Sequence, residues 1–90
     1  MKFPLGQVVT TPGALRLLEE KRVSPELLLK RHQNGDWGTI PKEDRTVNEI
    51  SVKQGFRVMS SYPIDDVDER IWIITEADRS VTTILKPEEY

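Results

Sequence analysis

Four side chains in the sequence could take part in phosphodiester cleavage. His32 is the only histidine, and its ordinary pKa near neutrality would suit a general acid or base. Arg79 could hold a phosphate or a carboxylate through paired hydrogen bonds, and Thr75 or Tyr62 could assist. Structural roles compete with this hypothesis. His32 would interact with carbonyl groups in the last turn of a helix, and Arg79 would pair with a neighbouring carboxylate in a turn.

A tryptophan between two glycines is a second candidate site. The segment Gly35-Asp36-Trp37-Gly38 predicts a constrained loop, because glycine permits a tight backbone turn on each side. An aromatic ring held in this way could stack on a base or anchor a partner protein. Alternatively, Trp37 fills the gap between helices and a sheet.

The densest polar cluster surrounds an expected turn between two strands. It comprises Thr75, Glu76, Asp78, Arg79, Ser80, Thr82 and Thr83. Polar groups at the rim of a sheet could bind a ligand, whereas Asp78 and Ser80 could simply bond local N–H groups. We predict Glu76, Asp78 and Arg79, together with Asp36 and Trp37, as the binding residues. Whether the Trp37 loop and the turn form one site is left open.

The acidic run Asp65, Asp66, Asp68 and Glu69 could attract a cation. It lacks the glycine that a calcium-binding loop requires, so we predict a solvated loop instead. The chain has no cysteine, which excludes disulfides and thiolate zinc sites. It also contains no glycine-rich phosphate loop and no nucleophile elbow. We therefore expect no metal and no cofactor.

Helices are expected in the first half of the chain. Thr11-Pro12 and Ser24-Pro25 each combine an N-cap residue with a proline at the first helical position. The two helices that they begin would form a helical hairpin. A third helix, roughly Pro41–Gln54, has a thin apolar face that contains Val47 and Ile50, with Val52 as a further candidate. Before the helices, Gln7–Thr10 could be a brief strand or an extended arm.

Strands are expected in the second half. In Phe56–Tyr62, the side chains of Phe56, Val58, Ser60 and Tyr62 alternate with those of Arg57, Met59 and Ser61, which is the spacing of a strand. Arg70–Glu76 is rich in β-branched and aromatic residues, which favour strands. Val81–Leu85 forms a further strand after a turn. Both faces of Arg70–Glu76 are apolar, so this strand should be central and covered on both sides. The order predicts a single α+β domain, with the helices packed on a three- to four-stranded antiparallel sheet.

Size and charge limit the functional classes. The chain has 90 residues and a net charge of −2, which disfavours nucleic-acid binding. No apolar stretch approaches the roughly 18 residues that span a bilayer, and no signal peptide is apparent. We therefore expect a cytoplasmic location and no membrane partner. The sequence leaves the oligomeric state open, although an exposed strand edge would invite pairing.

Four segments carry a wider likeness, Met1–Gly6, Thr11–Leu15, His32–Gly38 and Arg70–Tyr90. In them the chain resembles a family of small bacterial proteins carried on plasmids and integrative elements. Members are labelled hypothetical or plasmid-related, and some as a type I restriction methylase subunit. A methylase would need a cofactor-binding α/β domain far longer than this chain. The resemblance therefore implies a mobile-element context, with no activity or site residues to carry over.

Three hypotheses about function follow. The first is a non-enzymatic accessory protein of a mobile element that binds a protein partner. The second is a small toxin-like ribonuclease that uses His32 and Arg79. The third is a DNA-binding protein that uses the basic residues of the helical hairpin, which are Arg16, Lys21, Arg22, Lys30 and Arg31. The absence of specific catalytic motifs favours the first.

Overall fold

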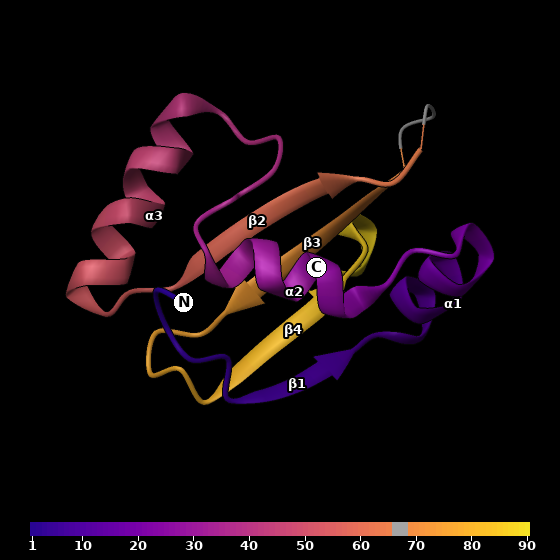
Figure 1. The fold of residues 1–90 in the computed structure, drawn as a ribbon, viewed down its shortest axis with the longest axis horizontal. Helices are drawn as coiled ribbons and strands as arrows, with labels where there is room; N and C mark the ends of the chain where they lie inside the picture. Colours follow the sequence, from indigo (N-terminus) through magenta and orange to yellow (C-terminus); the bar gives the residue numbers. More distant parts are fainter. Residues whose placement is uncertain (66–68) are drawn as a thin grey trace.

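Helices precede the main strands, as the α+β prediction requires (Figure 1). The computed structural model describes residues 1–65 and 69–90. Its elements are β1 (Gln7–Thr10), α1 (Pro12–Lys21), α2 (Pro25–Gln33), α3 (Lys42–Gln54), β2 (Val58–Pro63), β3 (Arg70–Thr75), β4 (Val81–Leu85) and a final 3-10 turn, η1 (Pro87–Glu89). None of the described helices is long and apolar enough to cross a membrane.

The four strands form one mixed sheet in the order β1-β4-β3-β2. β2, β3 and β4 make the expected antiparallel meander. The prediction of a purely antiparallel sheet is wrong, because β1 pairs with β4 in parallel. Parallel neighbours need a long crossover connection, and the three helices with β2 and β3 supply it. β3 occupies the predicted central position between β4 and β2.

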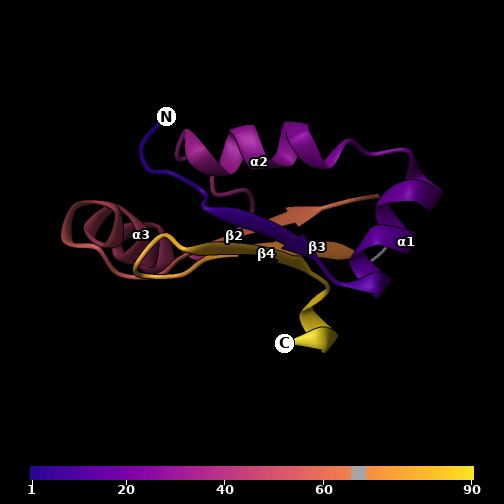
Figure 2. The same cartoon turned by 90° about the horizontal axis from the view of Figure 1, so that it is seen from below.

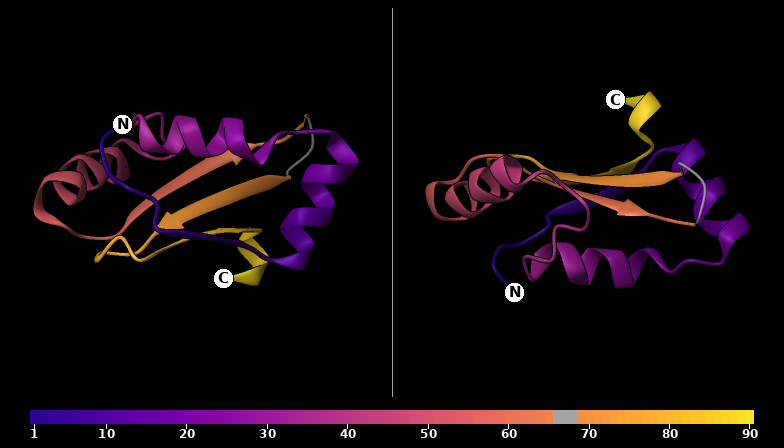
Figure 3. Two further views of the ribbon diagram at one scale, coloured as in Figure 1. Left: turned by 60° about the horizontal axis from the view of Figure 1, so that its bottom comes forward. Right: turned by 90° about the horizontal axis from the view of Figure 1, so that it is seen from above.

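The helices cover only one face of the sheet. Figure 2 shows α2 along that face and the C-terminal segment on the other side, and Figure 3 shows α1 beyond one end of the strands. α3 lies beside β2. The prediction that β3 is covered on both sides therefore holds only in part. Ile73 is fully buried on the side of α2, whereas Trp72 is half-buried on the other side.

Local signals in the sequence explain where the helices begin and end. The Thr11 hydroxyl accepts a hydrogen bond from the N–H of Ala14 at 3.3 Å, so it caps α1 as predicted. Ser24 occupies the N-cap position of α2, but the predicted capping bond is absent, and its hydroxyl instead donates to the Glu26 carboxylate at 2.9 Å. Gly55 ends α3 with a φ of 79°, a left-handed conformation that glycine adopts without strain.

Two hydrophobic clusters form the core. The larger one lies between α1, α2 and the sheet and includes Leu18, Leu28, Tyr62 and Ile73. The smaller one comprises Phe3, Trp37, Ile40 and Val58. Burying their apolar side chains provides the main favourable contribution to folding.

The predicted apolar face of α3 is wrong for Val47 and Ile50, whereas Val52 packs against the smaller core cluster. Val47 and Ile50 are 56% and 49% exposed, whereas Asn48 and Ser51 are buried. Hydrogen bonding, rather than apolar packing, turns Asn48 toward the sheet. The side-chain amide of Asn48 donates to the Met59 carbonyl at 2.7 Å and accepts from the Met59 N–H at 3.1 Å. Both backbone groups would otherwise remain unpaired at the edge of the sheet.

The outer edge of β2 is closed along its length. Asn48 bonds Met59, and the loop after α2 bonds the next outward residue, with the Ser61 N–H donating to the Trp37 carbonyl at 3.0 Å. The Thr39 N–H donates to the Ser61 carbonyl at 2.7 Å. Pro63, the last outward residue, has no N–H to offer. These contacts protect an edge that could otherwise pair with another chain.

A pair of glycine substitutions tests how closely this loop approaches β2. Gly38 and Gly55 both have left-handed φ, 75° and 79°, so alanine at either position should cost about 1–2 kcal/mol. A Cβ at Gly38 would also clash with the Ser61 carbonyl, whereas one at Gly55 meets nothing within 4 Å. Urea unfolding should therefore show Gly38→Ala to be less stable than Gly55→Ala by about 1–3 kcal/mol. Equal losses would contradict the close contact.

Candidate binding surface

His32 is completely buried between α2 and the sheet. Its exposed fraction is 0%. Its Nδ1 lies 2.6 Å from the Ser60 hydroxyl and its Nε2 lies 2.9 Å from the Thr75 hydroxyl. The Phe3 and Trp37 rings contact it edge-on, with centroids at 5.2 and 5.8 Å. The imidazole therefore has polar partners at both nitrogens and apolar surroundings elsewhere.

The hydrogen bonds around His32 form a chain with one allowed direction. The Leu5 carbonyl can only accept, so Thr82 donates to it at 2.7 Å. The Thr82 hydroxyl has then used its proton and must accept from Thr75, also at 2.7 Å. Thr75 in turn must accept from the Nε2–H of His32. In the neutral imidazole Nδ1 is then the acceptor, and the Ser60 hydroxyl donates to it.

Electrostatics also keep this histidine neutral. Burial, and then the positive charge of Arg79, lower the pKa of His32 to about 3. A general acid or base must come within about 2.6–3.2 Å of the proton that it transfers. With no exposed surface, His32 cannot do so in this conformation. The geometry thus gives the ribonuclease hypothesis no support at this residue.

Arg79 is occupied by backbone carbonyls. It adopts a φ of 61° in the turn between β3 and β4. Its guanidinium donates to the carbonyls of Phe56 at 2.7 Å, Glu76 at 3.0 Å and Ser51 at 2.9 Å. These bonds tie the hairpin turn to the end of α3 and the segment that follows it. Few of its five donors therefore remain for a phosphate.

Trp37 is part of the core. It is 4% exposed, its ring stacks near Phe3 with centroids 6.2 Å apart, and its Nε1–H donates to the Glu49 carboxylate at 3.0 Å. The structure therefore places the ring in the gap between helices and sheet. Asp36 beside it forms a two-point ion pair with Arg31, at 2.6 and 3.3 Å. That pairing lowers the pKa of the Asp36 carboxyl.

Three candidate residues converge on the ring of Phe3 rather than on a cavity. His32 and Trp37 contact this ring, and the Arg79 guanidinium carbon lies 5.3 Å from its centroid. The Trp37 loop and the hairpin turn thus meet through a residue that the sequence did not single out. The ring fills the space where a shared ligand would have to lie.

The remaining predicted residues make local contacts. Asp78 accepts from both the N–H and the hydroxyl of Ser80, at 3.0 and 2.6 Å, as the turn hypothesis expects. Glu76 is exposed. Tyr62 is fully buried and donates to the Asp36 carbonyl at 2.7 Å. Burial raises the pKa of Tyr62 to about 12.

The acidic run lies partly outside the described residues, which do not include Asp66 and Asp68. Asp65 pairs with Lys21 at 2.9 Å. Within residues 1–65 and 69–90, no group of three potential ligands could hold a metal ion.

Two of the basic residues in the helical hairpin form ion pairs with carboxylates. Lys21 pairs with Asp65, and Arg31 pairs with Asp36.

A different surface emerges on the side of the sheet away from α2. Paired residues of neighbouring strands face the same way, so the side chains on this side include Met59, Ser61, Arg70, Trp72, Ile74, Thr83, Leu85 and Val9. Ser61, Ile74 and Leu85 are buried, whereas Trp72 and Met59 are partly exposed. We call it the open face. The alternation in Arg70–Thr75 indicated two apolar sides, but local pattern could not show which side a helix would leave uncovered.

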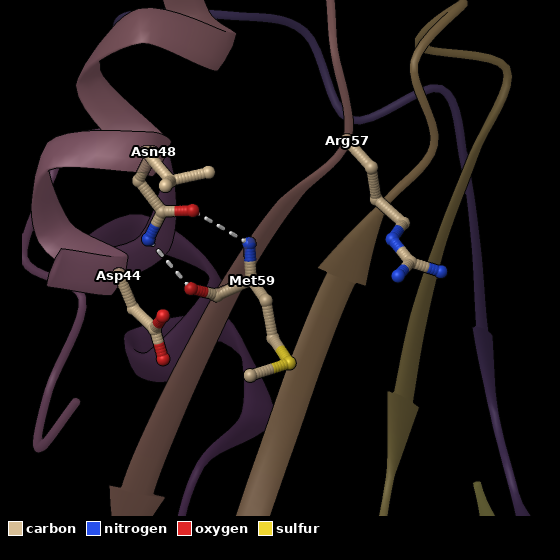
Figure 4. A pocket seen from close by; sticks show the side chains of 5 residues that line it. Asp44, Asn48, Arg57 and Met59 are labelled. Carbon is tan, nitrogen blue, oxygen red and sulfur yellow. Dashed lines mark hydrogen bonds between the residues drawn. The ribbon is translucent and has the colours of Figure 1, made fainter. Parts of the chain in front are cut away.

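Two adjoining hollows lie where the open face meets α3. The first, about 210 Å³, is lined by Asp44, Val47, Asn48, Arg57 and Met59 (Figure 4). The second, about 240 Å³, shares Asp44 and Met59 and extends to Arg70 and Trp72. Each is smaller than most small-molecule pockets, which occupy roughly 300–1,000 Å³.

Aromatic and basic side chains flank these hollows. Trp72 meets the Tyr90 ring edge-on with centroids 5.8 Å apart. Arg57 donates to the Tyr90 hydroxyl at 3.0 Å and lies 5.8 Å from its ring centroid. Tyr90 itself is 67% exposed. This combination of tryptophan, tyrosine, arginine and methionine is typical of protein interfaces.

Comparison with known protein families, with curated proteins and with solved structures finds no match to this chain. The likeness to mobile-element proteins therefore stays a prediction.

The state of His32 can be measured directly. Nitrogen chemical shifts should show the Nε2–H tautomer at neutral pH, with no titration of the imidazole between pH 8 and 5 because its folded pKa is about 3. The unfolded chain binds a proton near its ordinary value of 6.5, so stability is full above that pH and falls as pH drops from 6.5 toward 3. A folded-state midpoint near 6.5 would contradict the burial.

Two threonine-to-valine substitutions test the hydrogen-bonded chain. Thr75→Val keeps the shape and strand preference but removes the hydroxyl between His32 and Thr82. We expect a loss of about 1–3 kcal/mol, because it leaves buried polar groups unpaired. Thr83→Val, on the half-exposed open face, is the matched control and should change stability by less than about 0.5 kcal/mol. Denaturant unfolding measures the free energy of unfolding of both variants. Similar losses of stability would argue against the hydrogen-bonded chain.

Proposed function

We propose that this chain is a non-enzymatic protein-interaction module, an accessory protein of a bacterial mobile element that binds a partner protein through its open face. The observation that carries the proposal is the half-buried Trp72 beside two adjoining hollows, on the side of the sheet away from the helix α2. The mobile-element context rests on the resemblance in the sequence.

The structural roles of His32, Arg79 and Trp37 support binding rather than catalysis. His32 is buried and neutral at physiological pH, and Arg79 is bonded to three carbonyls. Trp37 belongs to the core. Each of these residues stabilises the fold, which leaves no assembled acid, base and phosphate-holding group among them. Binding needs none of these.

The chemistry of the open face indicates what the partner presents. Met59, Trp72 and the exposed Val47 offer apolar contact, while Arg57 and Arg70 lie at the margins of the hollows. A partner segment with an apolar side chain and a nearby carboxylate fits this arrangement. The Asp44 carboxylate in both hollows and the net charge of −2 disfavour a nucleic-acid backbone.

Site-specific photo-crosslinking in cells of the source bacterium tests the proposal. A photoreactive residue at Val47, which lines the first hollow, should give a discrete crosslink to a partner protein. The control position is Leu27, which is similarly exposed at 62% but lies on α2, on the other face. We expect no such product there, because α2 lies away from the open face.

Charge reversal sharpens the same experiment. Arg57→Glu should reduce the Val47 crosslink by about tenfold if Arg57 meets a partner carboxylate. Lys30→Glu on α2 has the same change in charge and should leave the yield unchanged. Equal crosslinking from both positions, or a product that ribonuclease or deoxyribonuclease removes, would rule out a protein partner at the open face.

A further inference from the structure

The outer edge of β1 has backbone groups that face away from the sheet. The Gln7 N–H donates to the Ser80 carbonyl at 2.9 Å, and the Thr11 N–H donates to the Ile84 carbonyl at 3.0 Å. Successive residues of a strand point their backbone groups to opposite sides. Val8 and Thr10 therefore direct N–H and C=O away from β4. In the view of Figure 2, no other described segment lies over β1.

The two edges of the sheet differ in how far other segments cover them. β2 is closed by Asn48, by the Trp37–Thr39 loop and by Pro63. Within residues 1–65 and 69–90, no loop or side chain closes β1 in this way. The strand itself, Gln-Val-Val-Thr, contains no charge and no proline. Val8 and Val9 are each 40% exposed. An unguarded edge with β-branched residues is suited to pairing with another strand.

We infer that two copies of this chain associate by pairing β1 with β1 in antiparallel fashion about a two-fold axis. The sequence of the strand fits itself in this arrangement. Val8 of each copy lies opposite Thr10 of the other, and each such pair exchanges two backbone hydrogen bonds. Val9 meets Val9 of the second copy at the axis. The two sheets become one continuous sheet.

Charges at the ends of the strand are complementary in this register. Pro12, at the start of α1, lies opposite Gly6 of the second copy. Gly6 packs against the hairpin turn, since a Cβ there would meet the carbonyl oxygens of that turn. The exposed Arg16 of α1 thus lies near the second copy's turn, with its exposed Glu76 and Asp78. Opposite charges at both ends favour a second copy as the occupant.

The size of the contact sets its strength. β1 has only four residues, so the interface falls below the roughly 800 Å² per partner of a standard complex. We expect a weak dimer, with a Kd on the order of 100 μM. Sedimentation equilibrium from about 10 μM to 1 mM covers that range. The Val8 and Thr10 amides should exchange more slowly with solvent as concentration rises.

Substitution at the axis distinguishes this pairing from other association. Val9→Lys places like charges opposite each other and should abolish the dimer across the concentration range. Ile50→Lys, at an exposed β-branched residue on α3, adds the same charge elsewhere and should leave the dimer intact. An equal mixture of Val9→Lys and Val9→Glu should dimerise again, because opposite charges then meet.

The inference fails if the chain remains monomeric at the highest concentration, or if Val9→Lys and Ile50→Lys weaken association equally. It also fails if the Lys–Glu mixture stays monomeric. None of these outcomes affects crosslinking at the open face, so this test and that of the proposed function can fail separately.

Discussion

The hydrogen-bonded chain through His32 connects elements that the hydrophobic core alone would leave free to shift. It joins α2 to β2 through Ser60, and to β3 and β4 through Thr75 and Thr82. It ends on the Leu5 carbonyl, just before β1. A buried polar group without a partner costs about 1–3 kcal/mol, more than the roughly 0.5–1.5 kcal/mol that a typical hydrogen bond contributes. The chain therefore fixes the position of α2 over the sheet and the path of the N-terminal arm at the same time.

A second constraint concerns the edges and faces of a small sheet. The described helices cover only part of the sheet. α2 covers one face, and α3 with its preceding loop closes the β2 edge. The open face and the β1 edge are what remain. Each is suited to a different kind of contact, since the face offers side chains and the edge offers backbone groups.

The small size of the core also explains why the candidate polar residues stabilise the fold. A domain with one modest core has few ways to bond its buried backbone, and Arg79 supplies three carbonyls with donors. Asn48 serves two groups of Met59. Residues used in this way cannot also turn toward a substrate without exposing unpaired groups. Surfaces whose side chains make fewer such bonds are therefore better suited to binding a partner.

Local chemistry in the sequence determined the helix starts at Thr11-Pro12 and Ser24-Pro25, the end at Gly55, the strand periods and the hairpin turn. Each depends on residues within a few positions of one another. Tertiary structure alone decided that β1 runs parallel to β4, that His32 is buried and neutral, and that Asn48 faces inward while Val47 faces out. These outcomes depend on partners far along the chain, such as Thr75 for His32 and Met59 for Asn48. A pattern of neighbouring residues carries no information about which distant donor will find which acceptor.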